Sequence, residues 1–313
     1  MTVNSLFIES PMQAVQVNGF NIHIKRDDLL NHHFSGNKAR KLGYFLDTDL
    51  PSINKIIGHG SVQANLLYAL AALAKLKSWQ LDFYVQRIPD WLNKNPTGNY
   101  RGALALGANI VDVCAEGIEL ETNLDDLMRA KAKDLPSDTL FIPEGGRCFE
   151  AKHGIKQLAK EITEYCSLNN LENPIVMLPS GTGTTALFLQ TLLPFKVLTC
   201  ACVGDDRYLQ KQFAELSANQ SDWPEILALE KKYHYGKLYP EFYQIWQQLK
   251  LQTGIDFELL YDPLGWLNLL AYLNQKNSKD LKPKEDIIYI HQGGLVGNES
   301  MLPRYRRKYG NSV

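Results

Sequence analysis

Lys38 is the residue of this chain best placed for covalent chemistry. It directly follows Gly36 and Asn37 and opens an apolar pattern typical of a helix, so its amine can be held rigidly toward a cleft. A free lysine amine has a pKa of about 10.4 and attacks a carbonyl carbon only after desolvation has favoured its neutral form. This position meets a requirement of an imine-forming lysine, although a lysine taken at random is usually just solvated.

A second candidate is the glycine-rich loop that follows Pro179 and Ser180. Glycine and threonine alternate there in the order Gly181, Thr182, Gly183, Thr184, Thr185. Backbone N–H groups between a strand and a helix approach an anion closely, the helix dipole stabilises its charge, and threonine hydroxyls add donors. The loop lacks the Gly-Lys-Ser/Thr ending of a nucleotide P-loop. Taken alone, it is either an anion site or a plain tight turn.

The elements around these residues follow an alternating order. A strand at 53–57, a helix at 61–77 and a strand at 81–85 indicate parallel strands joined by crossover helices. Further strands are predicted at 110–113, 139–142, 174–178, 196–203 and 286–290. The predicted fold class is α/β, with open, mostly parallel twisted sheets flanked by helices in two domains. We expect a smaller domain at 46–154 and a larger one that combines 1–45 with 155–313.

Composition narrows the function classes. The 313 residues include 33 basic and 34 acidic side chains, giving a formal net charge of -1 without a long block of one sign. We expect no nucleic-acid partner, and we interpret the basic segment 304–308 as a solvated end. The five cysteines show no metal-binding spacing, so we expect no metal and a reducing cytoplasm. No apolar run is long enough to predict a membrane span.

Residues 24–42, which include Lys25-Arg26-Asp27-Asp28 and the Lys38 segment, resemble a known family. They are similar to the segment carrying the cofactor lysine in the 1-aminocyclopropane-1-carboxylate (ACC) deaminase and D-cysteine desulfhydrase family. Further family-like segments follow in the same order at 98–108, 143–146, 180–185 and 291–294. The resemblance covers most of the chain. It implies the tryptophan-synthase-β fold (fold type II), pyridoxal 5'-phosphate (PLP) as cofactor, a small amino-acid substrate and a homodimer.

The resemblance also implies residue roles. Lys38 would hold PLP and act as base at the substrate α-carbon, and Tyr235 would face the substrate. The cofactor would further contact Asn65 at its phenolic oxygen, Gln292 near its ring nitrogen, and the phosphate cup Gly181, Thr182, Gly183, Thr184 and Thr185. Backbone N–H groups of Ala64, Asn65 and Leu66 would receive the substrate carboxylate. Two alternatives remain at this stage: an ordinary helix start capped by Ser61, and a packing role for Tyr235.

Four positions depart from the family pattern. Ala64 replaces a serine, and Gln292 stands where the family has threonine or leucine. Gly265 and Trp266 occupy the positions of a tyrosine and of a glutamate or small hydroxyl residue. These changes count against ACC ring opening and weaken the assignment to D-cysteine.

We therefore predict a PLP-dependent lyase or deaminase of amino-acid metabolism, similar to D-cysteine desulfhydrase or ACC deaminase but with an altered substrate pocket. A β-replacement enzyme or racemase is the alternative within enzymes, because both reactions begin with the same abstraction of the α-proton. A PLP-binding homologue without turnover is the alternative among proteins that are not enzymes. A plain nucleotide-binding α/β module is more distant.

Overall fold

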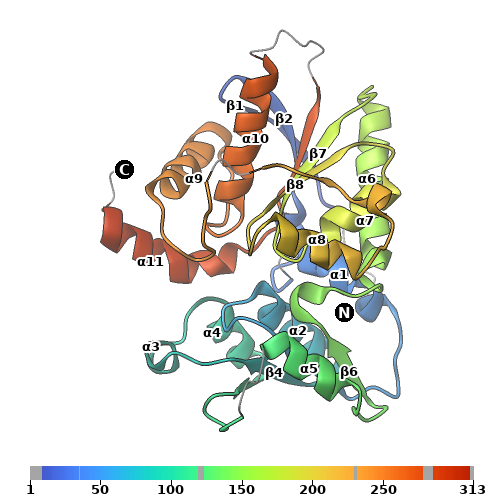
Figure 1. Ribbon diagram of the computed structural model, residues 1–313, viewed down its shortest axis with the longest axis vertical. Helices are drawn as coiled ribbons and strands as arrows, with labels where there is room; N and C mark the ends of the chain where they lie inside the picture. Colours follow the sequence, from blue (N-terminus) through green and yellow to red (C-terminus); the bar gives the residue numbers. More distant parts are fainter. Residues whose placement is uncertain (1–8, 35, 119–122, 229–230, 278–284, 311–313) are drawn as a thin grey trace.

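The computed structural model describes residues 9–34, 36–118, 123–228, 231–277 and 285–310. Figure 1 shows two layered units, one above the other, each built around a β-sheet. The described strands form a six-stranded sheet in the order β1-β2-β10-β7-β8-β9 and a four-stranded sheet in the order β5-β4-β3-β6. All pairings are parallel except that of β1 with β2. The α/β class predicted from the alternating pattern is confirmed.

The larger sheet begins with a hairpin. Asn18 and Gly19 both have positive φ, 50° and 83°, and form the two-residue turn between β1 and β2. The sheet comprises β1 Met12–Val17, β2 Phe20–Lys25, β7 Ile175–Ser180, β8 Val197–Ala201, β9 Glu225–Ile226 and β10 Ile287–Ile290.

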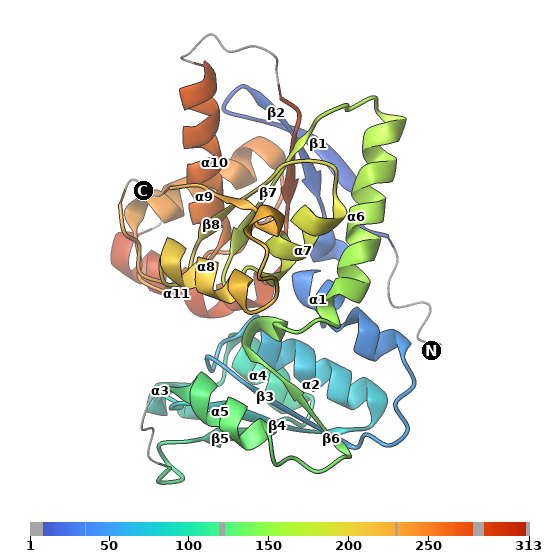
Figure 2. The same ribbon diagram turned by 45° about the vertical axis from the view of Figure 1, so that its right-hand side comes forward.

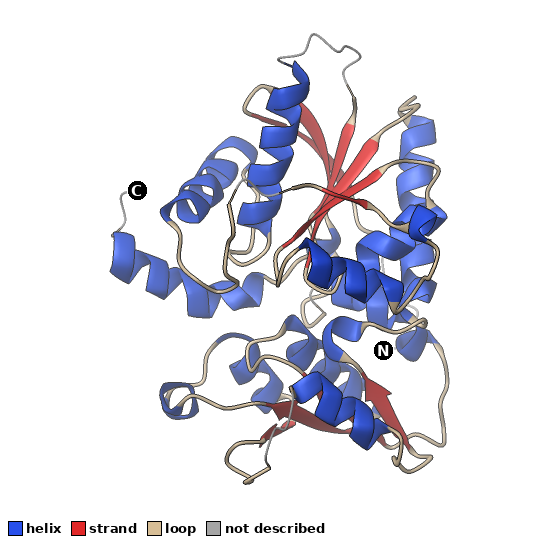
Figure 3. Cartoon of the chain, in the orientation of Figure 1, coloured by secondary structure: helices blue, strands red, loops and turns tan. Residues whose placement is uncertain are grey.

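Both faces of this sheet are covered by helices (Figure 3). Along β7, Ile175 and Met177 belong to the core shared with α9 and α10, whereas Val176 and Leu178 belong to the core shared with α6 and α7. Successive side chains of a strand point to opposite faces, so a strand buried on both sides reads as an unbroken apolar run. That explains why the sequence at 175–178 carries no alternation.

The smaller sheet consists of β3 Lys55–His59, β4 Gln80–Val85, β5 Asn109–Asp112 and β6 Thr139–Ile142. These four strands fall within residues 46–154, and the six of the larger sheet fall outside them. On this basis we propose the domain boundaries stated above. Figure 2 shows α2 lying along this sheet on the side that faces the larger unit.

The described helices are α1 Gly36–Asp47, α2 Asn65–Lys77, α3 Asp90–Lys94, α4 Gly98–Ala105, α5 Leu124–Ala132, α6 Ala151–Leu168, α7 Thr184–Leu192, α8 Asp206–Ala214, α9 Pro240–Thr253, α10 Asp262–Asn277 and α11 Asn298–Tyr309. The interpretation of 304–308 as a solvated end was wrong in part. Tyr305 is fully buried in α11 and stacks on Tyr243, so this basic segment is the outer face of a packed helix. Among the helices described here, none combines the length and apolar character needed to cross a membrane.

A buried ionic network fixes α1 to its neighbours. Arg40 pairs with Asp27 at 2.8 Å and with Glu161 of α6 at 2.7 Å, and Lys25 pairs with Glu161 at 2.6 Å. Ser10 donates its hydroxyl to Asp27 at 2.6 Å. All five side chains are buried, so the network holds α1, which carries Lys38, at a defined place beside β2 and α6.

Candidate active site

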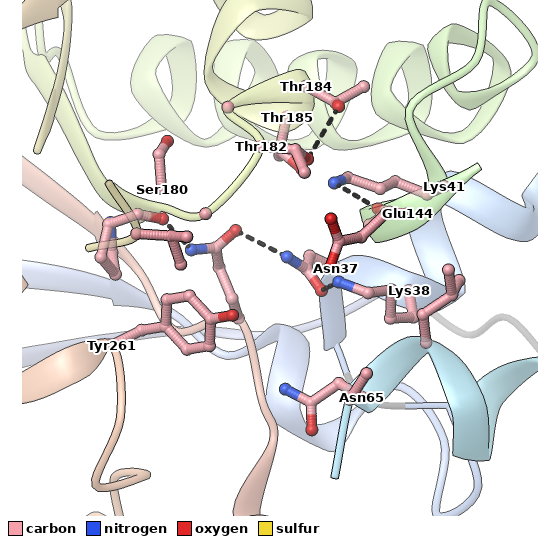
Figure 4. A pocket seen from close by; sticks show the side chains of 18 of the residues that line it. Asn37, Lys38, Lys41, Asn65, Glu144, Ser180, Thr182, Thr184, Thr185 and Tyr261 are labelled. Carbon is pink, nitrogen blue, oxygen red and sulfur yellow. Dashed lines mark hydrogen bonds between the residues drawn. The ribbon is translucent and has the colours of Figure 1, made fainter. Parts of the chain in front are cut away.

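The predicted site residues gather at one cavity of about 200 Å³ between the two sheets. Its walls come from loops that follow the carboxyl ends of β3, β6, β7 and β10, which is where open α/β sheets bind ligands. Figure 4 shows Lys38 and Asn65 on one side and the threonine loop on the other. Every residue proposed from the sequence lines this cavity: Lys38, Ala64, Asn65, Leu66, Gly181, Thr182, Gly183, Thr184, Thr185, Tyr235 and Gln292.

Lys38 lies in the first turn of α1 with its amine directed into the cavity (Figure 4). Its Nζ donates to Oδ1 of Asn37 at 2.9 Å, and the side chain is only 8% exposed. Burial lowers the pKa of Lys38 to about 8, because the charged amine loses its hydration. A larger fraction of this amine is therefore neutral near pH 7 than for a solvated lysine.

Lys41, one helical turn further along α1, brings a second buried amine to the cavity. It donates to the backbone oxygen of Gly145 at 2.9 Å, which ties α1 to the turn after β6. Burial and then the nearby charge of Lys38 lower the pKa of Lys41 well below its usual value. The sequence analysis did not single out Lys41.

Gln292 connects the larger sheet to α1 across the base of the cavity. Its Nε2 donates to the backbone oxygen of Pro179 at 2.6 Å, and its Oε1 accepts from Nδ2 of Asn37 at 3.0 Å. Its backbone oxygen accepts from the N–H of Asn37 at 3.1 Å. A Cβ at Gly36 would lie 2.3 Å from that same oxygen, so only glycine permits this approach.

The glycine-rich loop runs from β7 directly into α7. Gly183 has φ of +69°, in the left-handed region, and a Cβ there would lie 2.3 Å from the ring of Phe213. The hydroxyls of Thr182 and Thr184 lie 3.2 Å apart. Within the described residues, the buried hydroxyl of Thr185 has no hydrogen-bond partner. These donors, together with the start of α7, form a cradle suited to an anion.

The start of α2 differs from the capped helix considered as an alternative. The helix begins at Asn65 with Ala64 at the N-cap, and Ala64 has no side chain that could cap it. Ser61 lies outside the helix and accepts from the N–H of Gln63 at 3.3 Å, so the alternative of a helix capped by Ser61 does not hold. The first N–H groups of a helix lack intrahelical partners, so an uncapped start beside a cavity is a place for a carboxylate. Asn65 accepts from Asn99 at 2.8 Å, which fixes its amide.

Two tyrosines meet at the mouth of the cavity. The ring centroids of Tyr235 and Tyr261 lie 5.3 Å apart at 54°. Burial raises the pKa of Tyr261 well above its usual value, so its hydroxyl stays protonated at neutral pH. Tyr261 immediately precedes Asp262 and Pro263, and the sequence analysis passed over it because it looked for a tyrosine after that pair.

Gly265 and Trp266 are absent from the cavity wall as described. Trp266 is fully buried in the core, where it stacks on Tyr289 at 4.4 Å between centroids. A Cβ at Gly265 would lie 2.8 Å from the hydroxyl of Tyr289 and 3.1 Å from Pro179, so a larger side chain has no room there. Tyr261 thus supplies the second cavity tyrosine from the preceding turn.

The carboxylate of Glu258 stabilises the turn at residues 260–262 by hydrogen bonds to its backbone. It accepts N–H groups from Leu260 at 2.7 Å and from Asp262 at 2.6 Å, and also from Tyr261, so it caps the start of α10. Burial raises the pKa of Glu258 to about 7, although these three N–H groups favour its ionised form. Other wall residues that were not predicted from the sequence are Asn37, Lys41, Glu144, Tyr208, Tyr261 and Asp262.

Comparison with known proteins agrees with this geometry. No family model matches the chain. A putative ACC deaminase of Thermotoga maritima is 24% identical over 89% of this chain and 90% of its own length. The D-cysteine desulfhydrase of Serratia proteamaculans is 27% identical over 88% of this chain and 87% of its own. Over about nine tenths of its length the chain is thus similar to proteins of the ACC deaminase and D-cysteine desulfhydrase family.

The fold of the chain also matches a solved structure. A crystal structure of an ACC deaminase homologue superposes with a TM-score of 0.72, covering 97% of this chain and 93% of the other at 22% identity. The fold is therefore that of the fold type II PLP enzymes, as the resemblance implied. These comparisons leave the roles of individual cavity residues to be argued from geometry.

Proposed function

We propose that this protein is a PLP-dependent lyase or deaminase acting on a small amino acid, similar to D-cysteine desulfhydrase or ACC deaminase. One observation carries the proposal: the buried Lys38 amine and the glycine-threonine loop face the same cavity. PLP requires both an amine that forms an imine and a cradle for its phosphate. The related proteins supply the reaction class, and D-cysteine and ACC are the first substrates to test.

The residues present fit PLP. The buried Thr185 hydroxyl has no partner among the described residues, as expected for a donor reserved for a ligand. A Cβ at Gly181 would lie 3.3 Å from the Tyr261 ring, so glycine leaves the loop open beside the cavity. Thr182, Thr184 and Thr185 would hold the phosphate, Asn65 the phenolic oxygen, and Gln292 would lie at the ring nitrogen.

When bound, PLP draws electrons from the bond that is broken at the substrate α-carbon. The protein must then hold the substrate and move protons. The uncapped start of α2 at Ala64, Asn65 and Leu66 receives the substrate carboxylate. Lys38, with a pKa of about 8, is placed to exchange the α-proton near neutral pH. Tyr235 and Tyr261 present protonated hydroxyls to the leaving side of the substrate.

The attachment of the cofactor is tested by its covalent capture. The purified protein is incubated with PLP, reduced with borohydride and mapped by peptide mass spectrometry. We expect a pyridoxyl adduct on Lys38 in the wild type and in Lys41→Ala, and none in Lys38→Ala. An adduct on Lys41 in place of Lys38, or an unchanged adduct yield in Lys38→Ala, would contradict the proposal.

The reaction class is tested on the same preparation. Release of ammonia and a keto acid from D-cysteine, ACC or another small amino acid supports a lyase or deaminase. Inversion of the α-carbon without ammonia release would identify a racemase, and exchange of the β-substituent would identify a β-replacement enzyme. A Lys38 adduct that no D- or L-amino acid alters would contradict turnover altogether. We also propose a homodimer, by resemblance to the family, to be measured by sedimentation equilibrium.

A further inference from the structure

Glu144 extends into the cavity from the turn that follows β6 (Figure 4). Its backbone is fixed on both sides. Gly145 has φ of +70°, and a Cβ there would lie 2.6 Å from the hydroxyl of Thr182. Lys41 donates to the backbone oxygen of Gly145 at 2.9 Å. The position of the Glu144 side chain is therefore set by the fold rather than by a loose loop.

The Glu144 side chain lies beside the segment that would hold the substrate carboxylate. A Cβ at Gly60 would be 3.5 Å from Glu144 Oε1 and 3.7 Å from its Cγ. Gly60 directly precedes Ser61, which lines the cavity together with Ala64 and Asn65. A substrate whose carboxylate sits at the start of α2 would thus have Glu144 as a close neighbour.

In the described part of the chain, no hydrogen bond or ion pair ends on the Glu144 carboxylate. The two cavity amines are directed elsewhere, Lys38 to Asn37 and Lys41 to Gly145. Arg147, three residues further along, pairs with Asp125 at 3.3 Å and with Glu215 at 3.4 Å. The charge of Arg147 offsets part of the desolvation of this carboxylate, but Arg147 makes its ion pairs with Asp125 and Glu215.

The neighbouring charges balance without Glu144. Arg129 pairs with Asp125 and Glu215, each at 2.7 Å, and Arg147 bridges the same two carboxylates. Two guanidinium groups therefore face two carboxylates. Burial, and then the charge of Asp125, raise the pKa of Glu144. A cation supplied by a ligand would favour its ionised form and compensate for its desolvation.

We propose that Glu144 selects amino-acid substrates whose side chain ends in a positively charged amine. The inference rests on the proposed function, because it assumes that the cavity holds an amino acid with its carboxylate at the start of α2. The same carboxylate repels a second acidic group, so it also excludes acidic amino acids. Ser61 and Tyr208, which line the cavity with Glu144, add polar rather than apolar surface.

The test compares amino acids of similar size and different side-chain charge. Binding of 2,3-diaminopropionate, serine and aspartate, each as both enantiomers, is measured from the change in the absorption spectrum of the PLP-loaded protein immediately after rapid mixing, before turnover. We expect the wild type to bind one diaminopropionate enantiomer at least tenfold more tightly than the matching aspartate. In Glu144→Gln this ratio should fall to within about threefold, and in Glu144→Lys it should invert.

Glu150→Gln is the matched control, because Glu150 is exposed, lies six residues further along and does not line the cavity. It should keep the wild-type ratio. Equal wild-type affinity for the three amino acids, or an unchanged ratio in Glu144→Gln, would overturn the inference. An equal loss of affinity for all three amino acids in Glu144→Gln would also overturn it, because Glu144 would then have a role that does not depend on the charge of the substrate side chain.

The pyridoxyl adduct on Lys38 is mapped in each of these proteins. An adduct without charge selection overturns this inference and leaves the proposed function standing. Absence of the adduct from the wild type overturns both.

Discussion

The amine of Lys38 donates to the side-chain oxygen of its chain neighbour Asn37 at 2.9 Å. Asn37 in turn donates to Gln292, and Gln292 to the backbone oxygen of Pro179. This chain of hydrogen bonds runs from α1 to the end of β7, immediately before the glycine-rich loop. The lysine and the anion cradle are therefore held relative to one another by the side chains of Asn37 and Gln292.

The buried state of Lys38 predicts how its reactivity depends on pH. Because its pKa is lowered to about 8, the amine is protonated and unreactive below that pH and neutral above it. We expect the rate of pyridoxyl labelling of Lys38 to rise with pH and to reach half of its maximum near pH 8. In urea-unfolded protein the midpoint should move toward about 10.4, the value of a free lysine. Identical midpoints in folded and unfolded protein would show that burial does not tune this amine.

Gly183 predicts a difference between two glycine substitutions of equal backbone strain. Gly183 and Gly254 have nearly the same φ, +69° and +72°, but only at Gly183 would a Cβ clash, with Phe213 and Leu209. Gly254→Ala should cost about 1–2 kcal/mol of unfolding free energy, the cost of a left-handed alanine. Gly183→Ala should cost clearly more and weaken PLP retention. Urea denaturation measures the unfolding free energy of each variant, and dialysis of the labelled cofactor measures its PLP retention. Equal losses of unfolding free energy and equal PLP retention in the two variants would argue against a tightly packed phosphate cup.

The tyrosine pair at the cavity mouth predicts a loss of turnover without loss of cofactor. Tyr235→Phe and Tyr261→Phe each remove one hydroxyl and keep the ring contact at 5.3 Å. If the hydroxyls transfer or hold a proton, kcat should fall by roughly 10²-fold in each variant while the Lys38 adduct is retained. Tyr44→Phe is the control, since Tyr44 packs against Phe45 and His153 away from the cavity. An unchanged kcat in both cavity variants would assign the pair to packing alone.

Most of the fold and the centre of the site could be predicted from the sequence. Strand-length apolar runs and helical periodicity are local signals, and β6 was predicted with the bounds Thr139–Ile142 that the structure has. Lys38 and the loop at 181–185 could be found because their motifs resemble those of a known family in the same chain order, whereas the loop taken alone was equally consistent with a plain tight turn. Every site residue proposed on that basis lines the cavity, although their roles remain proposals.

The missed wall residues share a physical reason. Glu144 comes from the turn after β6 and Tyr261 from the loop between α9 and α10, and their meeting at one cavity depends on how the two sheets are placed. Glu258 looks like any acidic loop residue until three backbone N–H groups close around it. Trp266, in contrast, drew attention through its alignment with a family site residue, but the structure places it in the core. Spacing along the chain does not encode which side of a turn faces a cavity.

The ionic network behind α1 predicts an unequal response of two glutamates on the same helix. Glu161 is buried and pairs with both Arg40 and Lys25, whereas Glu164 is exposed and pairs only with Lys160 at 3.6 Å. Removing one partner of a buried ion pair costs about 3–5 kcal/mol, and an exposed pair is worth about 0–1 kcal/mol. Glu161→Gln should therefore lower the unfolding free energy by several kcal/mol, and Glu164→Gln by less than about 1 kcal/mol.

The same network predicts a pH dependence of stability. Burial alone would raise the pKa of Glu161, but hydrogen bonds and charges from Arg40 and Lys25 outweigh it and hold the pKa below its usual range. Its contribution is thus complete above the unfolded-state pKa of about 4.3 and is lost as the pH falls through the lower folded value. Urea denaturation at pH 7 and across pH 3–5 checks both statements. The destabilisation caused by Glu161→Gln should shrink as the pH is lowered, because the wild-type glutamate is then protonated too; a constant difference would mean that the charge of Glu161 does not hold α1 in place.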